Sequence, residues 1–185
     1  MFTEPHLLVR KQTGVSLVEL VMFIVIVSVA VVGVLSVMDV TNRASADPAR
    51  RKQAIAIAES LLEEIELQPF TFCDPHDPNA SIVANAAACT IAQGLAANGE
   101  SRYAEPRFDN VGDYNNFQMT GIRDIFNTPV AGLESFNANV SVTQDGASFN
   151  LPNDAALRID VAVTAGPTSI TLTGYRFRYA PRAVP

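Results

Sequence analysis

Hydrophobic side chains are concentrated in one unbroken stretch near the start of the chain. Residues 20–38 read LVMFIVIVSVAVVGVLSVM and contain no charge. At about 1.5 Å per residue, a helix of this length approaches the roughly 30 Å thickness of a bilayer core. The pattern therefore predicts an apolar helix over residues 15–38 that is long enough to span a membrane.

A different pattern follows and predicts an amphipathic helix over residues 39–69. Apolar side chains recur at intervals of three and four residues, which gathers them on one helix face: Ala54, Ala58, Leu61, Leu62 and Ile65. We interpret the neighbouring glutamates Glu63, Glu64 and Glu66 as a solvated face of this helix rather than as a pair of catalytic carboxylates.

Helix-start and helix-stop residues mark the limits of this second segment. Asp47 can cap a helix and Pro48 is accepted in a first turn, so we expect a break between the two helical segments there. Pro69 ends the second segment, because a proline nitrogen has no hydrogen to donate.

Strict alternation of apolar and polar residues predicts strands between residues 136 and 179. Ala165-Gly166-Pro167 predicts a hairpin turn before the last strand, ITLTGYRFRYA. In that strand the apolar positions change phase at Gly174, which predicts a glycine bulge. An antiparallel sheet with a helix across one face is an α+β fold, and we place its globular domain at residues 70–185.

Residues 71–117 show no sustained pattern and predict a long loop with a short helix around residues 82–92. Two cysteines lie in it, Cys73 and Cys89, too few and too far apart for a zinc site built from cysteine pairs. Outside the cytoplasm we expect them to form a disulfide, which stabilises a fold by about 3 kcal/mol for a loop of this size. Two free buried thiols are the alternative.

The segment RFDNVGDYNNF, residues 107–117, gathers oxygen-bearing side chains around a glycine. Calcium takes such oxygens as ligands, which makes Asp109 and Asp113 candidates. Their spacing is not that of an EF-hand, and turns built by Asx side chains explain the composition equally well. The sequence thus predicts turns without a metal, with calcium as the alternative.

Charge and motifs exclude several classes of function. The chain has 13 Lys and Arg against 19 Asp and Glu, a formal net charge of −6, so nucleic acid is not an expected partner. The arginines of the last strand, Arg176 and Arg178, are expected on a solvent face. Motifs of hydrolases, phosphate-binding loops and metalloproteases are missing. His76 is expected as an exposed loop residue, with a metal site formed with its neighbours Asp74 and Asp77 as the alternative. We expect no enzyme and no cofactor.

Flanking charges predict the orientation of the apolar helix. Arg10 and Lys11 precede it, whereas Asp39 and Arg43 follow it. This basic bias holds the N-terminus in the cytoplasm and sends residues 70–185 to the periplasmic or extracellular side. A cleaved signal peptide is the competing interpretation, but its apolar core is shorter and a small-residue cleavage site follows it directly.

One carboxylate, Glu19, interrupts the apolar character of GVSLVELVMFIVIV. A charged side chain costs about 2.5–3.5 kcal/mol at the centre of a bilayer and less near its interface, so Glu19 favours a cationic partner. Cleavage after Gly14 would create an α-amino group on Val15, and Glu19 of one subunit could pair with the amine of a neighbour. A plain signal anchor with an interfacial Glu19 is the alternative.

The motif G-V-S-L-V-E-L, with a short basic leader before it and an apolar run after it, resembles the N-terminus of type IV prepilins and of type II secretion pseudopilins. This resemblance implies a leader of residues 1–14, cleavage between Gly14 and Val15 by prepilin peptidase, N-methylation of Val15, and assembly guided by Glu19. Val15 stands where Phe or Met is more usual, and Ser36 lies near the place of a common helix proline.

Within that family, the stretch SADPARRKQAIAIAESLLEEIELQPF followed by FCDP is similar to the D group of minor pilins of the mannose-sensitive haemagglutinin (MSHA) pilus. The resemblance covers roughly the first 75 residues, with a weaker echo at residues 108–117. It implies a pilin-like fold, a place in the bacterial inner membrane through residues 15–38 and then in a pilus, and partners among other pilin subunits and the assembly platform. A secretion pseudopilin and a membrane-anchored binding or adhesive module are the alternatives.

Overall fold

The computed structural model describes the backbone of residues 14–182 and the side chains of residues 14–40 and 48–182. Residues 1–13 of the predicted leader, with Arg10 and Lys11, lie outside the described residues, as do the side chains of Arg43 and Asp47. The chain divides into two compact units, Met1–Ala46 and Asp47–Pro185, which we describe separately.

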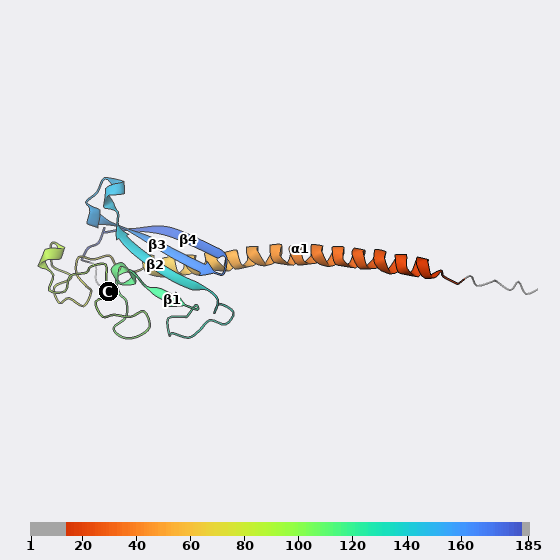
Figure 1. The fold of residues 1–185 in the computed structure, drawn as a ribbon. Coiled ribbons are helices and arrows are strands. Elements are labelled where there is room, and N and C mark those ends of the chain that lie inside the picture. The colour runs from red at the N-terminus through yellow and green to blue at the C-terminus, as the bar shows by residue number, and fades with distance from the viewer. Residues whose placement is uncertain (1–13, 183–185) are drawn as a thin grey trace, which may run out of the picture. The chain divides into compact units, whose positions relative to one another are not determined.

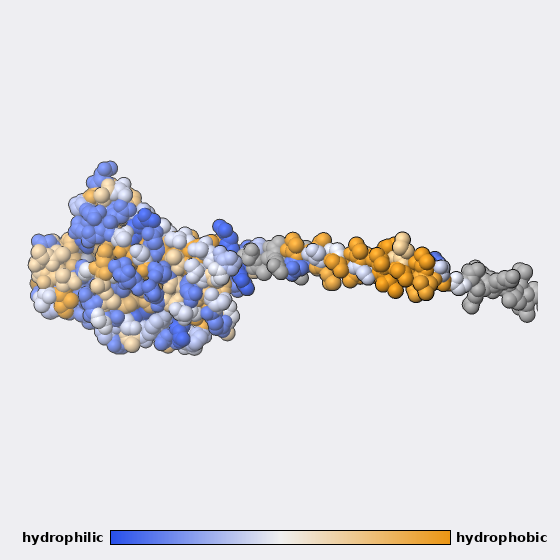
Figure 2. Space-filling model, viewed as in Figure 1, coloured by the Kyte–Doolittle hydropathy of each residue, from blue (hydrophilic) through white to orange (hydrophobic). Residues whose placement is uncertain are grey.

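The described part of the first unit is helical and apolar. Helix α1 (Leu17–Glu66) begins there, and its stretch Leu17–Val40 has a mean hydropathy of 3.0 with none of its side chains buried. Figure 2 shows the apolar surface along this stretch. By length and composition, this is one helix that can cross a membrane.

Helix α1 contradicts the predicted break at Pro48, because its backbone is helical from Leu17 through Glu66 with Pro48 inside. A proline removes the hydrogen bond of its own nitrogen, while the neighbouring turns keep theirs. The helix ends before Pro69 as predicted.

The second unit is built on a four-stranded antiparallel sheet (Figure 1). The strands are β1 (Gln118–Thr120), β2 (Asn137–Gln144), β3 (Ala156–Ala165) and β4 (Thr168–Phe177), and they lie in the order β1-β2-β3-β4. The predicted hairpin joins β3 to β4, with Ala165 opposite Thr168. Strand β1 was not expected, because three residues are too short for alternation to be recognised.

The core lies between the sheet and residues 54–65 of α1, which confirms the α+β class. The predicted helix stripe is buried, with Ala54, Ala58 and Ile65 fully inaccessible to solvent. It packs in one cluster with the inward residues of the sheet: Ala138, Val140, Val142, Leu157, Ile159, Val161 and Val163. Side chains alternate across a strand, so the polar residues between these face outward.

The glycine bulge predicted at Gly174 is wrong. Strands β3 and β4 pair residue for residue along their whole length, with Gly174 opposite Ile159. Gly174 is buried under α1, and a Cβ added to it would lie 2.1 Å from Glu66 Oε1 and 2.9 Å from Leu62 Cδ1. The glycine at this position therefore allows α1 and β4 to approach each other closely. The aromatic residues that follow it lie on the outer face, where Phe149 packs edge-on against Tyr175 and Phe177.

The connections carry only short 3₁₀ turns, which are η1 (Ala86–Ala88), η2 (Val111–Tyr114), η3 (Gly146–Phe149) and η4 (Asn153–Ala155). The helix predicted around residues 82–92 is thus reduced to the three residues of η1. The predicted disulfide between Cys73 and Cys89 is present. It joins the two ends of the segment that contains η1.

The expectation of a solvent face for Arg176 and Arg178 is also wrong. Arg176 donates two hydrogen bonds to the carbonyl of Gln68 at the end of α1, and Arg178 lies 4.1 Å from the ring centroid of Phe70. Arg178 also pairs with Asp154 at 2.9 Å. A planar guanidinium can satisfy carbonyls and cover aromatic faces together, so both arginines fasten the C-terminal strand to the chain after α1.

Candidate functional site

The residues predicted for processing and assembly lie at the start of α1. Gly14, Val15 and Ser16 are non-helical and exposed, and the helix begins at Leu17. Glu19 lies in the first turn, where the helix dipole favours a carboxylate. Among the residues that the structure describes, Glu19 has no ion-pair partner. The peptide bond after Gly14 is therefore in accessible, non-helical backbone one turn before Glu19.

The two predicted calcium candidates, Asp109 and Asp113, lie at the start of η2. Asn110 caps this turn by accepting a hydrogen bond from Gly112, and Asp113 reciprocates by accepting one from the Asn110 nitrogen at 2.7 Å. The predicted Asx turn chemistry is therefore present. Turn formation is not the whole role of Asp109 and Asp113, because other acidic side chains lie close to them.

Four potential ligands from separate stretches of the loop 71–117 come together here. One oxygen each from Asp74, Glu100 and Asp109, and Nδ1 of His76, all lie within 4.8 Å of one another. We call these four residues the acidic cluster. His76 Nδ1 is 3.3 Å from Asp74, 3.3 Å from Glu100 and 3.0 Å from Asp109. The histidine is at the rim, with 58% of its side chain exposed, whereas Glu100 is only 4% exposed.

Asp113 lies directly against the acidic cluster and fixes its position. Its Oδ1 accepts a hydrogen bond from Gln93 at 2.8 Å, and its Oδ2 accepts from the backbone nitrogens of Asp109 and Asn110. Asp113 is itself buried. Its hydrogen-bond partners hold its carboxylate in place without neutralising the charge.

Burial and mutual repulsion perturb the carboxylates of the acidic cluster. Burial, and then the negative charges of Asp113 and Asp109, raise the pKa of Glu100 to about 8. Burial and the charges of Asp113 and Asp74 raise the pKa of Asp109 to about 6. Without a compensating cation, the site therefore retains protons at pH values where carboxyl groups are normally ionised.

A partly buried ion pair joins this loop to α1. Arg102 donates to both oxygens of Glu64 at 2.7 Å, and the hydroxyl of Tyr114 donates to Glu64 Oε1 at 2.9 Å. The interpretation of Glu64 as part of a solvated face is therefore wrong for this residue. Helical spacing alone did not reveal the pair, because its partners lie in a loop without periodicity.

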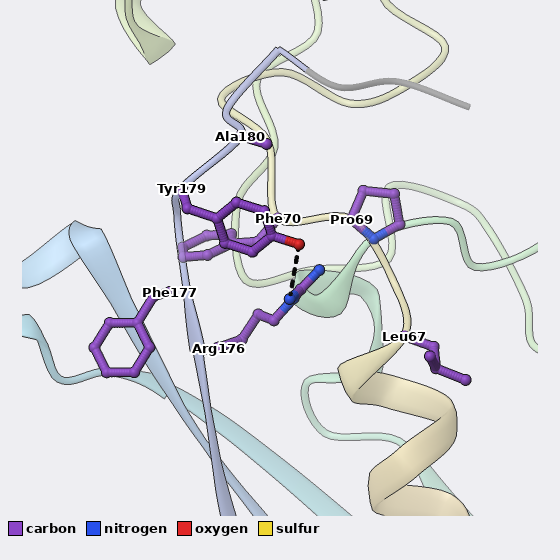
Figure 3. A pocket seen from close by; sticks show the side chains of 7 residues that line it. All are labelled: Leu67, Pro69, Phe70, Arg176, Phe177, Tyr179 and Ala180. Atoms are coloured by element: carbon purple, nitrogen blue, oxygen red, sulfur yellow. Dashed lines mark hydrogen bonds between the residues drawn. The ribbon is translucent and has the colours of Figure 1, made fainter.

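Two other features of the second unit do not form a reactive site. Cys73 and Cys89 lie close to Asp77, but sulfurs joined in a disulfide do not act as thiolate ligands. A small hollow lies where α1 ends, and Figure 3 shows Arg176 filling part of it beside Tyr179. The guanidinium there is already engaged with Gln68, so the hollow is part of the structural contact.

Sequence reasoning named Asp109 and Asp113, and considered His76 with its neighbours Asp74 and Asp77 as a separate metal site, but it missed Glu100. A signal was present for Asp74, because it flanks the histidine in CDPHDPN, but nothing in the sequence placed that segment beside residue 109. Backbone hydrogen bonds of Asp74 with Ile91, and of Phe72 with Gln93, place that segment beside residues 91–93, and the side chain of Gln93 in turn donates to Asp113. Comparison of the chain with protein-family models, curated proteins and solved structures finds no match.

Proposed function

We propose that this chain is a structural subunit of a type IV pilus, a minor pilin of the MSHA kind, cleaved after Gly14 and assembled through its N-terminal helix. The observation that supports this most is the arrangement of the first unit. A fully exposed apolar helix starts directly after the accessible Gly14-Val15 bond and carries one carboxylate, Glu19, in its first turn. A membrane anchor requires an apolar helix but does not require a carboxylate within it.

Assembly gives both features a role. In lipid, an apolar helix gains little from contacting another helix through apolar side chains alone. Once it leaves the membrane, its exposed apolar residues must be buried against other subunits, since water disfavours them. A filament with packed helices at its centre meets that requirement.

Glu19 then sets the register between neighbouring subunits. In an apolar filament core an unpaired carboxylate is strongly unfavourable, and the new α-amino group of Val15 in an adjacent subunit can neutralise it. A misplaced neighbour leaves both charges without partners, so the pair selects one arrangement over others. The second unit, with its polar surface, remains outside this core.

Processing is the first test of the proposal. In cells that contain an active prepilin peptidase, the wild-type chain should shorten by its leader, whereas Gly14→Val should keep its full size. Gly33→Val is a matched control, because it changes a glycine of the same helix away from the scissile bond, and it should be shortened normally. Shortening of Gly14→Val, or none of the wild type, would favour a membrane-anchored module instead.

A further inference from the structure

We propose that the carboxylates of Asp74, Glu100 and Asp109 bind a calcium ion in the second unit. The inference is independent of the proposed role in a pilus. Calcium binds oxygen ligands at 2.3–2.6 Å, so the oxygens around one ion lie at most about 5 Å apart. The ligand atoms of the acidic cluster meet this condition, since all lie within 4.8 Å of one another.

Two carboxylate oxygens of the acidic cluster are buried and accept no hydrogen bond. Glu100 Oε2 is inaccessible to solvent and has no hydrogen-bond partner, and its side chain is 96% buried because only 4% is exposed. Asp109 Oδ1 is also buried without a partner. Folded proteins rarely leave buried polar atoms unsatisfied, and each such atom requires an explanation. The other oxygens of the same two carboxylates, Glu100 Oε1 and Asp109 Oδ2, face His76. An ion coordinated by both carboxylates would give each of them a partner.

The charge of the acidic cluster is not balanced by the protein. Among residues 48–182, where side chains are described, the one cationic group recorded in contact with it is His76, which is largely exposed. The neighbouring loop arginines have other partners, since Arg102 is held by Glu64 and Arg107 by Glu105. A divalent cation supplies the positive charge that the buried carboxylates lack.

The donor set favours calcium over zinc or magnesium. Zinc sites are usually tetrahedral and rich in nitrogen or sulfur, whereas three of the four potential ligands here are carboxylates. Magnesium requires near-ideal octahedral geometry and releases its waters reluctantly. An irregular loop with carboxylates from three separate stretches suits the adaptable coordination of calcium, and the exposed rim at His76 leaves room for water ligands.

Bound calcium would fasten a loop that has little regular structure. Asp74 follows the disulfide at Cys73, Glu100 lies midway along the loop, and Asp109 precedes η2. An ion held by all three would reinforce the few backbone hydrogen bonds that join these segments, such as those of Ser101 with Pro106 and Phe108. Long loops without secondary structure need such ties in order to adopt one conformation.

Thermal unfolding of the full-length chain in detergent micelles tests the inference. Calcium chloride at millimolar concentration should raise the Tm by about 5 °C relative to EGTA, as expected for an ion present well above its Kd. Magnesium chloride at the same ionic strength should give a clearly smaller increase. Equal effects of the two salts, or no effect of calcium, would overturn the inference.

Single substitutions distinguish a variant that no longer binds calcium from a variant that no longer folds. Glu100→Gln should abolish the calcium-dependent increase while keeping a Tm in EGTA close to that of the wild type, because the neutral glutamine replaces a carboxyl group that is itself largely protonated when no cation is bound. Glu105→Gln, an exposed carboxylate of the same loop, should respond to calcium normally. His76→Gln should also keep the response. A larger effect of micromolar zinc that His76→Gln removes, or a calcium response retained by Glu100→Gln, would contradict the assignment.

Discussion

The guanidinium of Arg102 and the carboxylate of Glu64 form two parallel hydrogen bonds, Nε to Oε1 and Nη2 to Oε2, both 2.7 Å long. Arg102 is 8% exposed, and its Nη1 also donates to the carbonyls of Arg123 and Asp124. A single side chain therefore joins α1, the loop that carries Glu100, and the turn after β1. Bidentate pairs of this kind are both directional and stronger than pairs of neutral groups.

Loss of this arginine should destabilise the second unit markedly. Arg102→Met leaves the partly buried Glu64 without its cation and two carbonyls without a donor, so we expect the free energy of unfolding to fall by about 3 kcal/mol. Urea unfolding of the full-length chain in detergent measures it. Arg107→Met is the matched control, because its pair with Glu105 is largely exposed and contributes at most about 1 kcal/mol. Equal losses in the two variants would refute a special role for Arg102.

The close approach of α1 to β4 predicts intolerance of larger residues at Gly174. Gly174→Val should lower the free energy of unfolding by about 1–3 kcal/mol, because the new side chain must displace Leu62 and Glu66. Thr171→Val, on the outer face of the same strand, should change it by less than about 0.5 kcal/mol. A neutral Gly174→Val would mean that helix and strand are not held at this distance.

The raised pKa of Glu100 predicts that pH affects stability when calcium is chelated. The folded-state pKa of about 8 exceeds the ordinary value of 4.5, so the folded state retains a proton that the unfolded state loses. Glu100 faces Asp74, Asp109 and Asp113, with His76 at the rim, and the raised pKa of Asp109 acts in the same direction.

In EGTA, the free energy of unfolding should therefore decrease as the pH rises from about 5 to about 8. Glu100→Gln should reduce this decrease, since glutamine does not titrate, whereas Glu105→Gln should leave it unchanged. Unfolding curves at several pH values provide the measurement. A free energy of unfolding that is constant or increases over this range would show that burial and mutual repulsion do not raise the pKa of Glu100.

Pairing of Glu19 with a neighbour predicts an assembly defect that is separate from processing. Glu19→Ala should be cleaved normally, yet its amount in sheared pili should fall at least about tenfold, because the α-amino group of the neighbouring subunit loses its partner. Immunoblots of sheared pili and of whole cells report the two quantities. Glu59→Ala changes an exposed carboxylate elsewhere on α1 and should be incorporated normally. Wild-type incorporation of Glu19→Ala would argue against the pair.

The parts of the fold that the sequence predicted well are those governed by side-chain periodicity. The buried stripe of α1 and the alternating residues of β2 and β3 were identified because burial on one face leaves a regular pattern. Gly174 was misinterpreted because a glycine within a strand is compatible with a bulge or with a close neighbour. Only the position of Leu62 and Glu66 distinguishes the two.

The acidic cluster was predicted only in part for a related reason. Asp109 and Asp113 are close in sequence, so their composition was visible, whereas Asp74 and Glu100 join them through the path of an irregular loop. Glu64 was assigned to a solvated face because nothing in the helix pattern revealed Arg102. Contacts between distant segments without periodicity leave no local signal in a single sequence.

The mass of the mature N-terminal peptide tests the central claim most directly. The chain should be isolated from cells with an active prepilin peptidase, digested, and examined by mass spectrometry. Our account predicts a peptide that begins at N-methylated Val15, with Gly14 and all preceding residues removed. A peptide that still begins at Met1, or one cut at a site within or after the apolar helix, would contradict it.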